Sequence, residues 1–198
     1  PATVLDNNEL ARLYPEWPAE KIFEKTGIRE RRVCGADETA GDLAEQAARR
    51  LIASGGIDPV SIGFLLLVTQ SPDYFLPTTA CILQHRLGLP TTCGALDVNM
   101  GCSGYLYGLA LARGLIAAGT ARQVLLLAAE TYSRHLHPRD RSVRTIFGDG
   151  AAATLVSAAD APGIGAFVLG TDGGGFQKLI VPAGGMRLPR SPATAVEQ

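Results

Sequence analysis

The sequence predicts an α/β protein whose sheet is covered by helices on both faces, and three observations support this. Residues 62–68 (IGFLLLV) and 124–129 (VLLLAA) are apolar without alternation, which is typical of strands buried on both faces. Helical patterns separate such runs, and the longest covers residues 39–54. Strand and helix patterns alternate along the chain, which favours parallel strands joined by crossover helices.

The individual elements are predicted from apolar periodicity and from the glycines and prolines that interrupt it. The helix over 39–54 has an apolar face and ends at Gly55 and Gly56. Residues 151–157 and 165–170 have a short connection, so we expect an antiparallel pair at one side of a mixed sheet. The other predicted elements are helices over 8–13, 18–25, 78–87 and 103–118 and a strand over 95–98.

Composition narrows the function classes. The chain has 198 residues, of which 46% are hydrophobic, enough for a sizeable core. Its 18 Lys and Arg nearly balance its 19 Asp and Glu, so we expect no nucleic-acid partner. Every apolar run is shorter than the ~20 residues that cross a bilayer, so we expect no membrane partner.

The four cysteines lie in unlike contexts and form no C-x-x-C pair, so neither a zinc site nor a disulfide framework is predicted. They are Cys34, Cys81, Cys93 and Cys102. No secretory leader is visible at the start of the sequence. We therefore expect a protein of the reducing cytoplasm.

Cys102 lies in the stretch DVNMGCSGYLYGLALA (97–112), where a predicted strand gives way to a predicted helix. A thiol at a helix N-terminus is stabilised as the nucleophilic thiolate, and nearby backbone N–H groups can face an oxyanion. The alternative is a small buried residue, because free cysteine is often buried. The stripe of Gly104, Gly108 and Ala112 predicts that the helix packs closely against another helix.

Five segments in order resemble the 3-oxoacyl-(acyl-carrier-protein) synthase III family, condensing enzymes with a thiolase-like fold. They are DVNMGCSGYLYGLALA, KTGIRERRV (25–33), SPDYFLPTTACILQHRLGLP (71–90), DRSVRTIFGDGAAATLV (140–156) and GTDGGGFQKLIVPAGG (170–185). The resemblance implies a mixed sheet covered by helices on both faces. It also implies that residues 1–198 are the N-terminal half of a duplicated αβαβα architecture, with the C-terminal half absent.

The resemblance implies that Cys102 takes an acyl group from acyl-CoA or an acyl-carrier-protein thioester, with no further cofactor. The acyl-cysteine then condenses with malonyl-acyl carrier protein in a decarboxylative Claisen reaction of the kind used in fatty-acid biosynthesis. The family's histidine and asparagine, which promote decarboxylation, belong to the second half of a full-length chain, and no residue here matches them. A homodimer is implied as well.

The resemblance also implies binding residues. Arg141 matches an arginine that binds the CoA donor, and Lys25 occupies the position of another such arginine. Lys21 occupies the position of the tryptophan that stacks on adenine, while Trp17 lies one helical turn earlier. Leu76 matches the position that reaches into the partner subunit's acyl pocket, and the alternative is an ordinary core leucine.

Three further interpretations accompany these. His135 and His137 form an H-x-H pair that could bind metal, but without a third ligand we expect a solvated loop or subunit contact and no metal. We expect Asp149 to accept hydrogen bonds from backbone amides rather than to act as a base. Two alternative functions are a specialised-metabolism acyltransferase with another acceptor and a non-catalytic thiolase-fold subunit.

Overall fold

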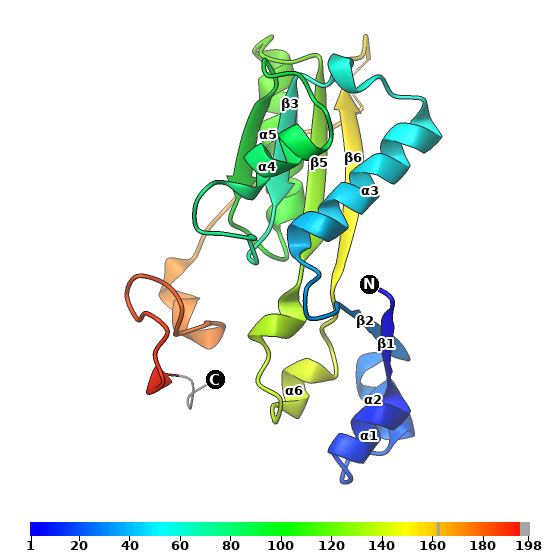
Figure 1. Cartoon of the computed structure of the whole chain (residues 1–198), viewed down its shortest axis with the longest axis vertical. Helices are drawn as coiled ribbons and strands as arrows, with labels where there is room; N and C mark the ends of the chain where they lie inside the picture. The colour runs from blue at the N-terminus through cyan, green and yellow to red at the C-terminus, as the bar shows by residue number, and fades with distance from the viewer. Residues whose placement is uncertain (162, 195–198) are drawn as a thin grey trace.

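The computed structural model describes residues 1–161 and 163–194, and its centre is a four-stranded mixed sheet (Figure 1). The strands lie in the order β4 (Gly94–Val98), β3 (Phe64–Val68), β5 (Gln123–Glu130) and β6 (Gly150–Ser157). β3 is parallel to β4 and β5, and β6 is antiparallel to β5. The predicted class, a mixed sheet with helices on both faces, is confirmed.

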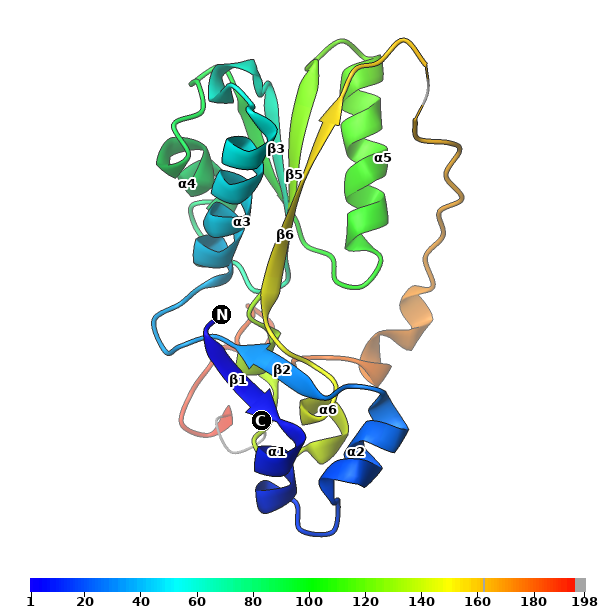
Figure 2. The same cartoon turned by 90° about the vertical axis from the view of Figure 1, so that its right-hand side faces the viewer.

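Two helices cover one face of the sheet and a third covers the other (Figure 2). α3 (Ala40–Gly55) and α4 (Thr79–Arg86) lie on one side, and α5 (Gly104–Ala117) lies on the opposite side. The sequence fixes the ends of α3: Thr39 and Asp42 form a capping box, and Gly56 ends the helix with a φ of 59°.

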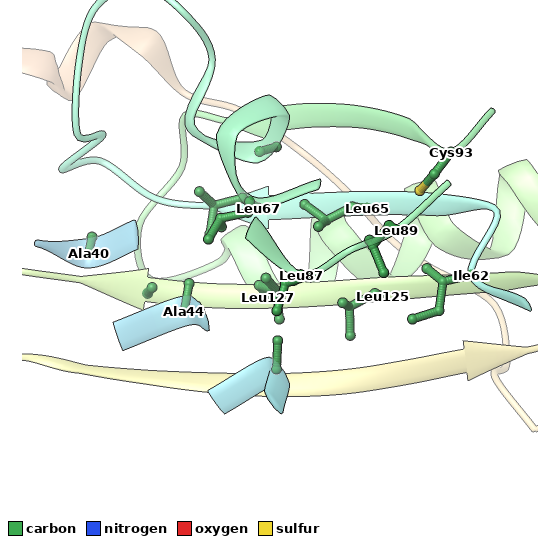
Figure 3. Packing of buried hydrophobic residues seen from close by; sticks show 14 residues of the cluster. Ala40, Ala44, Ile62, Leu65, Leu67, Leu87, Leu89, Cys93, Leu125 and Leu127 are labelled. Atoms are coloured by element: carbon green, nitrogen blue, oxygen red, sulfur yellow. The ribbon is translucent and has the colours of Figure 1, made fainter. Parts of the chain in front are cut away.

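The core lies on both sides of β3, as its unbroken apolar run predicts. Leu65 and Leu67 face α3 and α4 together with Leu125 and Leu127 of β5 (Figure 3). Leu66 and Leu126 point to the α5 side. All are fully buried, and replacing one leucine of such a core with alanine costs about 2–5 kcal/mol.

The small-residue stripe of α5 packs against the sheet, so the prediction that it contacts another helix is wrong. A Cβ atom added to Gly108 would lie 2.6 Å from Cδ1 of Leu126, and one added to Gly104 would lie 2.4 Å from Cγ1 of Val68. The glycines thus let α5 approach β3 and β5 closely. The short distance between α5 and the sheet explains why these positions hold small residues.

A second, smaller group of elements lies below the sheet in Figures 1 and 2. Its two strands pair antiparallel from Thr3↔Val33 to Asp6↔Glu30. Sequence analysis predicted two helices of this group and missed both strands, which are only four residues long. The group comprises β1 (Thr3–Asp6), α1 (Asn7–Leu13), α2 (Ala19–Thr26), β2 (Glu30–Val33) and α6 (Arg141–Arg144).

The strand predicted over residues 165–170 is not present. β6 pairs with β5 instead, in a register that runs from Gln123↔Ser157 to Glu130↔Gly150. Two side chains of α5 donate hydrogen bonds to the carbonyl groups at the two ends of the 165–170 segment. Arg113 donates to Gly165 O at 2.6 Å, and Tyr107 Oη donates to Gly170 O at 3.2 Å.

Short 3₁₀ helices complete the described residues: η1 (Pro59–Ser61), η2 (Tyr132–His135) and η3 (Gly173–Lys178). No helix in the described part of the chain is long and apolar enough to cross a membrane.

Candidate active site

Cys102 lies in the turn that joins β4 to α5 and is exposed. The helix begins at Gly104 with Ser103 as its N-cap, so the thiol precedes the first turn instead of lying within it. The alternative of a buried structural cysteine is therefore wrong. A thiol at this place is open to a substrate from solvent.

The loop after β3 supports the turn of Cys102. A Cβ atom at Gly101 would lie 2.4 Å from Oε1 of Gln70, so the Gln70 side chain rests against the Gly101 backbone. The backbone N–H of Gln70 donates to Oε1 of Glu130 at 2.7 Å, and Ser71 Oγ donates to Oε2 at 2.7 Å. The ends of β3 and β5 are thus tied together beside the cysteine.

Tyr132 is the aromatic neighbour of the cysteine. Burial raises its pKa, and the negative charge of a nearby Cys102 thiolate raises it further. Its ring packs on Phe147 with centroids 4.6 Å apart and forms a T-shaped pair with His135 at a centroid distance of 5.8 Å. These contacts make an aromatic wall of Tyr132, His135 and Phe147.

A cavity of about 790 Å³ opens beside this wall. Gln70 and Tyr132, which support and neighbour the cysteine turn, both line it. Its volume is within the range of about 300–1,000 Å³ that small-molecule sites occupy. The other lining residues are Asn99, residues 135–137, Asp140, Ser142, Val143, Phe147 and residues 177–182.

Asp149 has the structural role predicted for it. Its buried carboxylate accepts hydrogen bonds from the backbone N–H of Cys34 and of Ser133, both at 2.8 Å, and from Ser133 Oγ at 2.6 Å. It thereby joins the loop after β2 to η2. With these three donors on one carboxylate, the group is an anchor of the site rather than a base.

Two of the predicted donor-binding residues meet at Trp17. The Arg141 guanidinium lies over the indole ring at 5.0 Å from the centroid, and Lys21 Nζ lies at 5.2 Å. Arg141 also forms an ion pair of 2.7 Å with Glu16. Lys25 is in the last turn of α2, four residues after Lys21 and so on the same helix face.

Arg31 holds together the elements that carry this cluster. Its side chain is buried and donates to Oδ1 of Asn7 at the start of α1 and to the carbonyl of Thr145 at the end of α6. Tyr14 Oη adds a hydrogen bond of 2.8 Å to Pro138 O. Burial lowers the pKa of Arg31. These contacts connect α1, β2 and α6, the elements that lie next to Trp17 or carry Arg141.

Leu76 is 85% exposed, so the alternative of an ordinary core leucine is wrong. Its neighbours Tyr74 and Phe75 are 62% and 75% exposed. Three large apolar side chains therefore project from one loop ahead of α4. Such a patch is typical of a surface that another protein chain covers.

The H-x-H pair lines the cavity: His135 and His137 both contact it. Nδ1 of His135 is buried and lacks a hydrogen-bond partner. Within residues 1–161 and 163–194, no group of three His, Cys, Asp or Glu side chains is arranged to hold a metal ion.

Known proteins share both the sequence and the fold. The sequence profile of the family described as 3-oxoacyl-[acyl-carrier-protein] synthase III matches residues 96–173. A beta-ketoacyl-[acyl-carrier-protein] synthase III of Methylococcus capsulatus is 41% identical over 92% of this chain and 56% of its own. A crystal structure of a 3-oxoacyl-(acyl-carrier-protein) synthase III is 60% identical, with a TM-score of 0.96 over 98% of this chain and 58% of that one.

A more distant structure is the priming beta-ketosynthase from the R1128 polyketide biosynthetic pathway. It is 33% identical, with a TM-score of 0.80, over 88% of this chain and 52% of that one. These likenesses define the class of the chain as a thiolase-like α/β protein. The predicted resemblance to the 3-oxoacyl-[acyl-carrier-protein] synthase III family is confirmed as well, and the chain spans about half the length of the relatives it matches.

Several site residues were not found by sequence analysis. Glu130 looks like an ordinary polar residue at a strand end, and Gln70 carries no motif. Tyr132 begins η2, three residues before the H-x-H pair, and belongs to no motif of its own. Glu16 pairs with a residue 125 positions away, a contact that local pattern does not encode.

Proposed function

We propose that this chain is the nucleophile-bearing half-domain of a β-ketoacyl-[acyl-carrier-protein] synthase III, covering residues 1–198. The observation that carries the proposal is the exposed Cys102 thiol in the turn before α5, beside two residues that line a 790 Å³ cavity. The likeness to synthases III supports the same assignment. Cys102 is the catalytic residue in this proposal.

In the first step, the Cys102 thiolate attacks the carbonyl carbon of an acyl thioester. The C–S bond of the donor breaks, the donor thiolate takes a proton, and an acyl-cysteine remains. A thiol suits both steps because it is a good nucleophile and then a good leaving group. The backbone N–H groups of the turn are the donors we expect to face the oxyanion. No cofactor takes part, because the thioesters are themselves the substrates.

In the second step, a malonyl thioester on acyl carrier protein loses CO₂ and the resulting carbanion attacks the acyl-Cys102 carbonyl. A carbon–carbon bond forms and the Cys102 thiolate is released. Decarboxylation requires hydrogen-bond donors on the malonyl carbonyl to stabilise the enolate. The family resemblance assigns that role to a histidine and an asparagine that no residue of this chain matches.

The donor enters along the cluster around Trp17. Arg141 and Lys21 supply positive charge over one indole ring, which suits the phosphates and adenine of acyl-CoA. Lys25 extends the positive charge by one turn of α2. Lysines bind phosphate as point charges, so a carrier-protein donor is accommodated by the same residues.

The exposed loop at residues 74–76 supports a homodimer in which Leu76 reaches the acyl pocket of the partner subunit. Burial of three large apolar side chains by the partner would explain their exposure in the single chain. The free cysteines fit the reducing cytoplasm as the place of action.

A second candidate is an acyltransferase of specialised metabolism that passes the acyl group from Cys102 to another acceptor. The likeness to a priming ketosynthase of a polyketide pathway favours it, as do Lys21 and Lys25 at donor positions where the family has tryptophan and arginine. The reactive cysteine is common to both functions. The acceptor distinguishes them.

The test is acylation of Cys102. The protein is incubated with acyl-CoA, and the modified peptide is identified by mass spectrometry. We expect a single acyl group on Cys102, lost in Cys102→Ala and retained in Cys81→Ala, because Cys81 is also exposed and serves as the matched control. Acylation of Cys81 with Cys102 unmodified would overturn the proposal.

A further inference from the structure

The ion pair between Arg141 and Glu16 lies on the face of the cluster around Trp17. Arg141 Nη1 and Glu16 Oε1 are 2.7 Å apart, and the two side chains are 45% and 56% exposed. The same guanidinium lies over the Trp17 ring. The charge of the predicted donor-binding arginine is therefore paired with a carboxylate of the protein itself.

The position of Glu16 is set by its loop. Trp17 N–H donates to Tyr14 O at 2.8 Å, and Tyr14 Oη donates to Pro138 O at 2.8 Å. Lys21 Nζ reaches the Glu16 carbonyl at 3.5 Å. The Glu16 carboxylate is thus paired with Arg141, while Lys21 donates to the backbone carbonyl of the same residue beside a single aromatic ring.

An exposed ion pair contributes little stability, because water solvates both partners well. A phosphate group carries up to two negative charges and binds a guanidinium through two parallel hydrogen bonds, so it competes well against a single carboxylate. The free energy needed to displace Glu16 from Arg141 nevertheless lowers the affinity for any phosphate-bearing ligand.

We propose that Glu16 is a specificity-determining residue of the donor site: its carboxylate occupies Arg141 until the phosphates of the donor displace it. This inference rests on the proposed function, which makes Arg141 a donor-binding residue. Glu16 lowers the affinity for CoA-type donors and leaves the binding of phosphate-free thiols unchanged.

Trp17 provides the measurement, because it is the only tryptophan of the sequence. Its fluorescence is titrated with CoA and with pantetheine, which has no phosphate. We expect Glu16→Gln to lower the Kd for CoA about threefold, because the phosphates no longer have to break one weak exposed ion pair. The binding of pantetheine should be unchanged.

The matched control is Glu20→Gln, which removes the same charge from an exposed position in the first turn of α2. It should change the Kd for CoA by less than about 1.5-fold, since general screening weakens distant charges. In an Arg141→Gln background, Glu16→Gln should no longer improve CoA binding.

An unchanged or raised Kd for CoA in Glu16→Gln, with normal binding by the wild type, would overturn this inference and leave the proposed function intact. An equal gain in Glu20→Gln would overturn it too. Failure of the wild type to bind CoA at all would overturn the proposed donor site together with the inference.

Discussion

The Glu130 carboxylate accepts a hydrogen bond from the backbone N–H of Gln70 at 2.7 Å, which ties the end of β5 to the loop after β3. Burial raises the pKa of Glu130 above its ordinary value of 4.5 in spite of this bond and the one from Ser71. Because Gln70 rests against Gly101, this buried acid supports the turn that presents Cys102.

The raised pKa of Glu130 predicts a pH dependence of stability. The folded protein binds this proton more tightly than the unfolded chain, so its contribution is complete below pH 4.5 and is lost as the pH rises through the raised pKa. Glu130→Gln removes that loss and keeps an oxygen acceptor for Gln70.

We therefore expect Glu130→Gln to gain free energy of unfolding relative to the wild type as the pH rises from 4.5 through the raised pKa of Glu130. Urea denaturation at several pH values measures it. The exposed Glu24→Gln of α2 is the control for the removal of one carboxylate. A difference between Glu130→Gln and the wild type that does not change with pH would contradict the assignment.

The central sheet and its helices could be predicted because β3 and residues 124–129 of β5 are buried on both faces and are therefore apolar throughout. β1 and β2 could not be predicted, because a four-residue strand such as ERRV shows charge rather than alternation. Its buried Arg31 is stabilised by partners from distant segments. The 165–170 segment has the composition of a strand, but a strand forms only where an adjacent strand is free to pair with it, and β6 pairs with β5 instead.

The candidate site, too, has a part that the sequence predicts and a part that it does not. Cys102, Arg141 and Lys21 were predicted from short motifs, since each motif is local. The Glu16–Arg141 pair and the Glu130–Gln70 contact join residues 125 and 60 positions apart. Such contacts arise from the fold, so sequence alone gives no signal for them.

Arg31 is expected to position the donor site without touching the donor. Arg31→Lys keeps the charge and loses the forked contact with Asn7 and Thr145, because an ammonium cannot reproduce the planar geometry. Leaving these buried acceptors unsatisfied costs about 1–3 kcal/mol each. We expect lower stability and weaker CoA binding measured by Trp17 fluorescence.

The alkylation rate of Cys102 by iodoacetamide separates a positioning role from general damage. Arg31 lies in β2, and Cys102 is supported by β3 and β5, so the rate in Arg31→Lys should equal the wild-type rate at a temperature where both are folded. Arg32→Lys, at an exposed position next along the strand, is the matched control. CoA affinity retained in Arg31→Lys would contradict the positioning role.

The two sides of α5 should respond in opposite ways to the same substitution. In Gly108→Ala, the new methyl group would lie 2.6 Å from Cδ1 of Leu126, a fully buried side chain that cannot move aside, so strain should outweigh the gain in helix propensity and cost about 1–2 kcal/mol. In Gly114→Ala, nothing lies within 4 Å of the new Cβ, and the better helix former should add about 0.5–1 kcal/mol. Thermal or urea unfolding of both variants measures the difference. Equal effects would mean that α5 does not pack on β5 through Gly108.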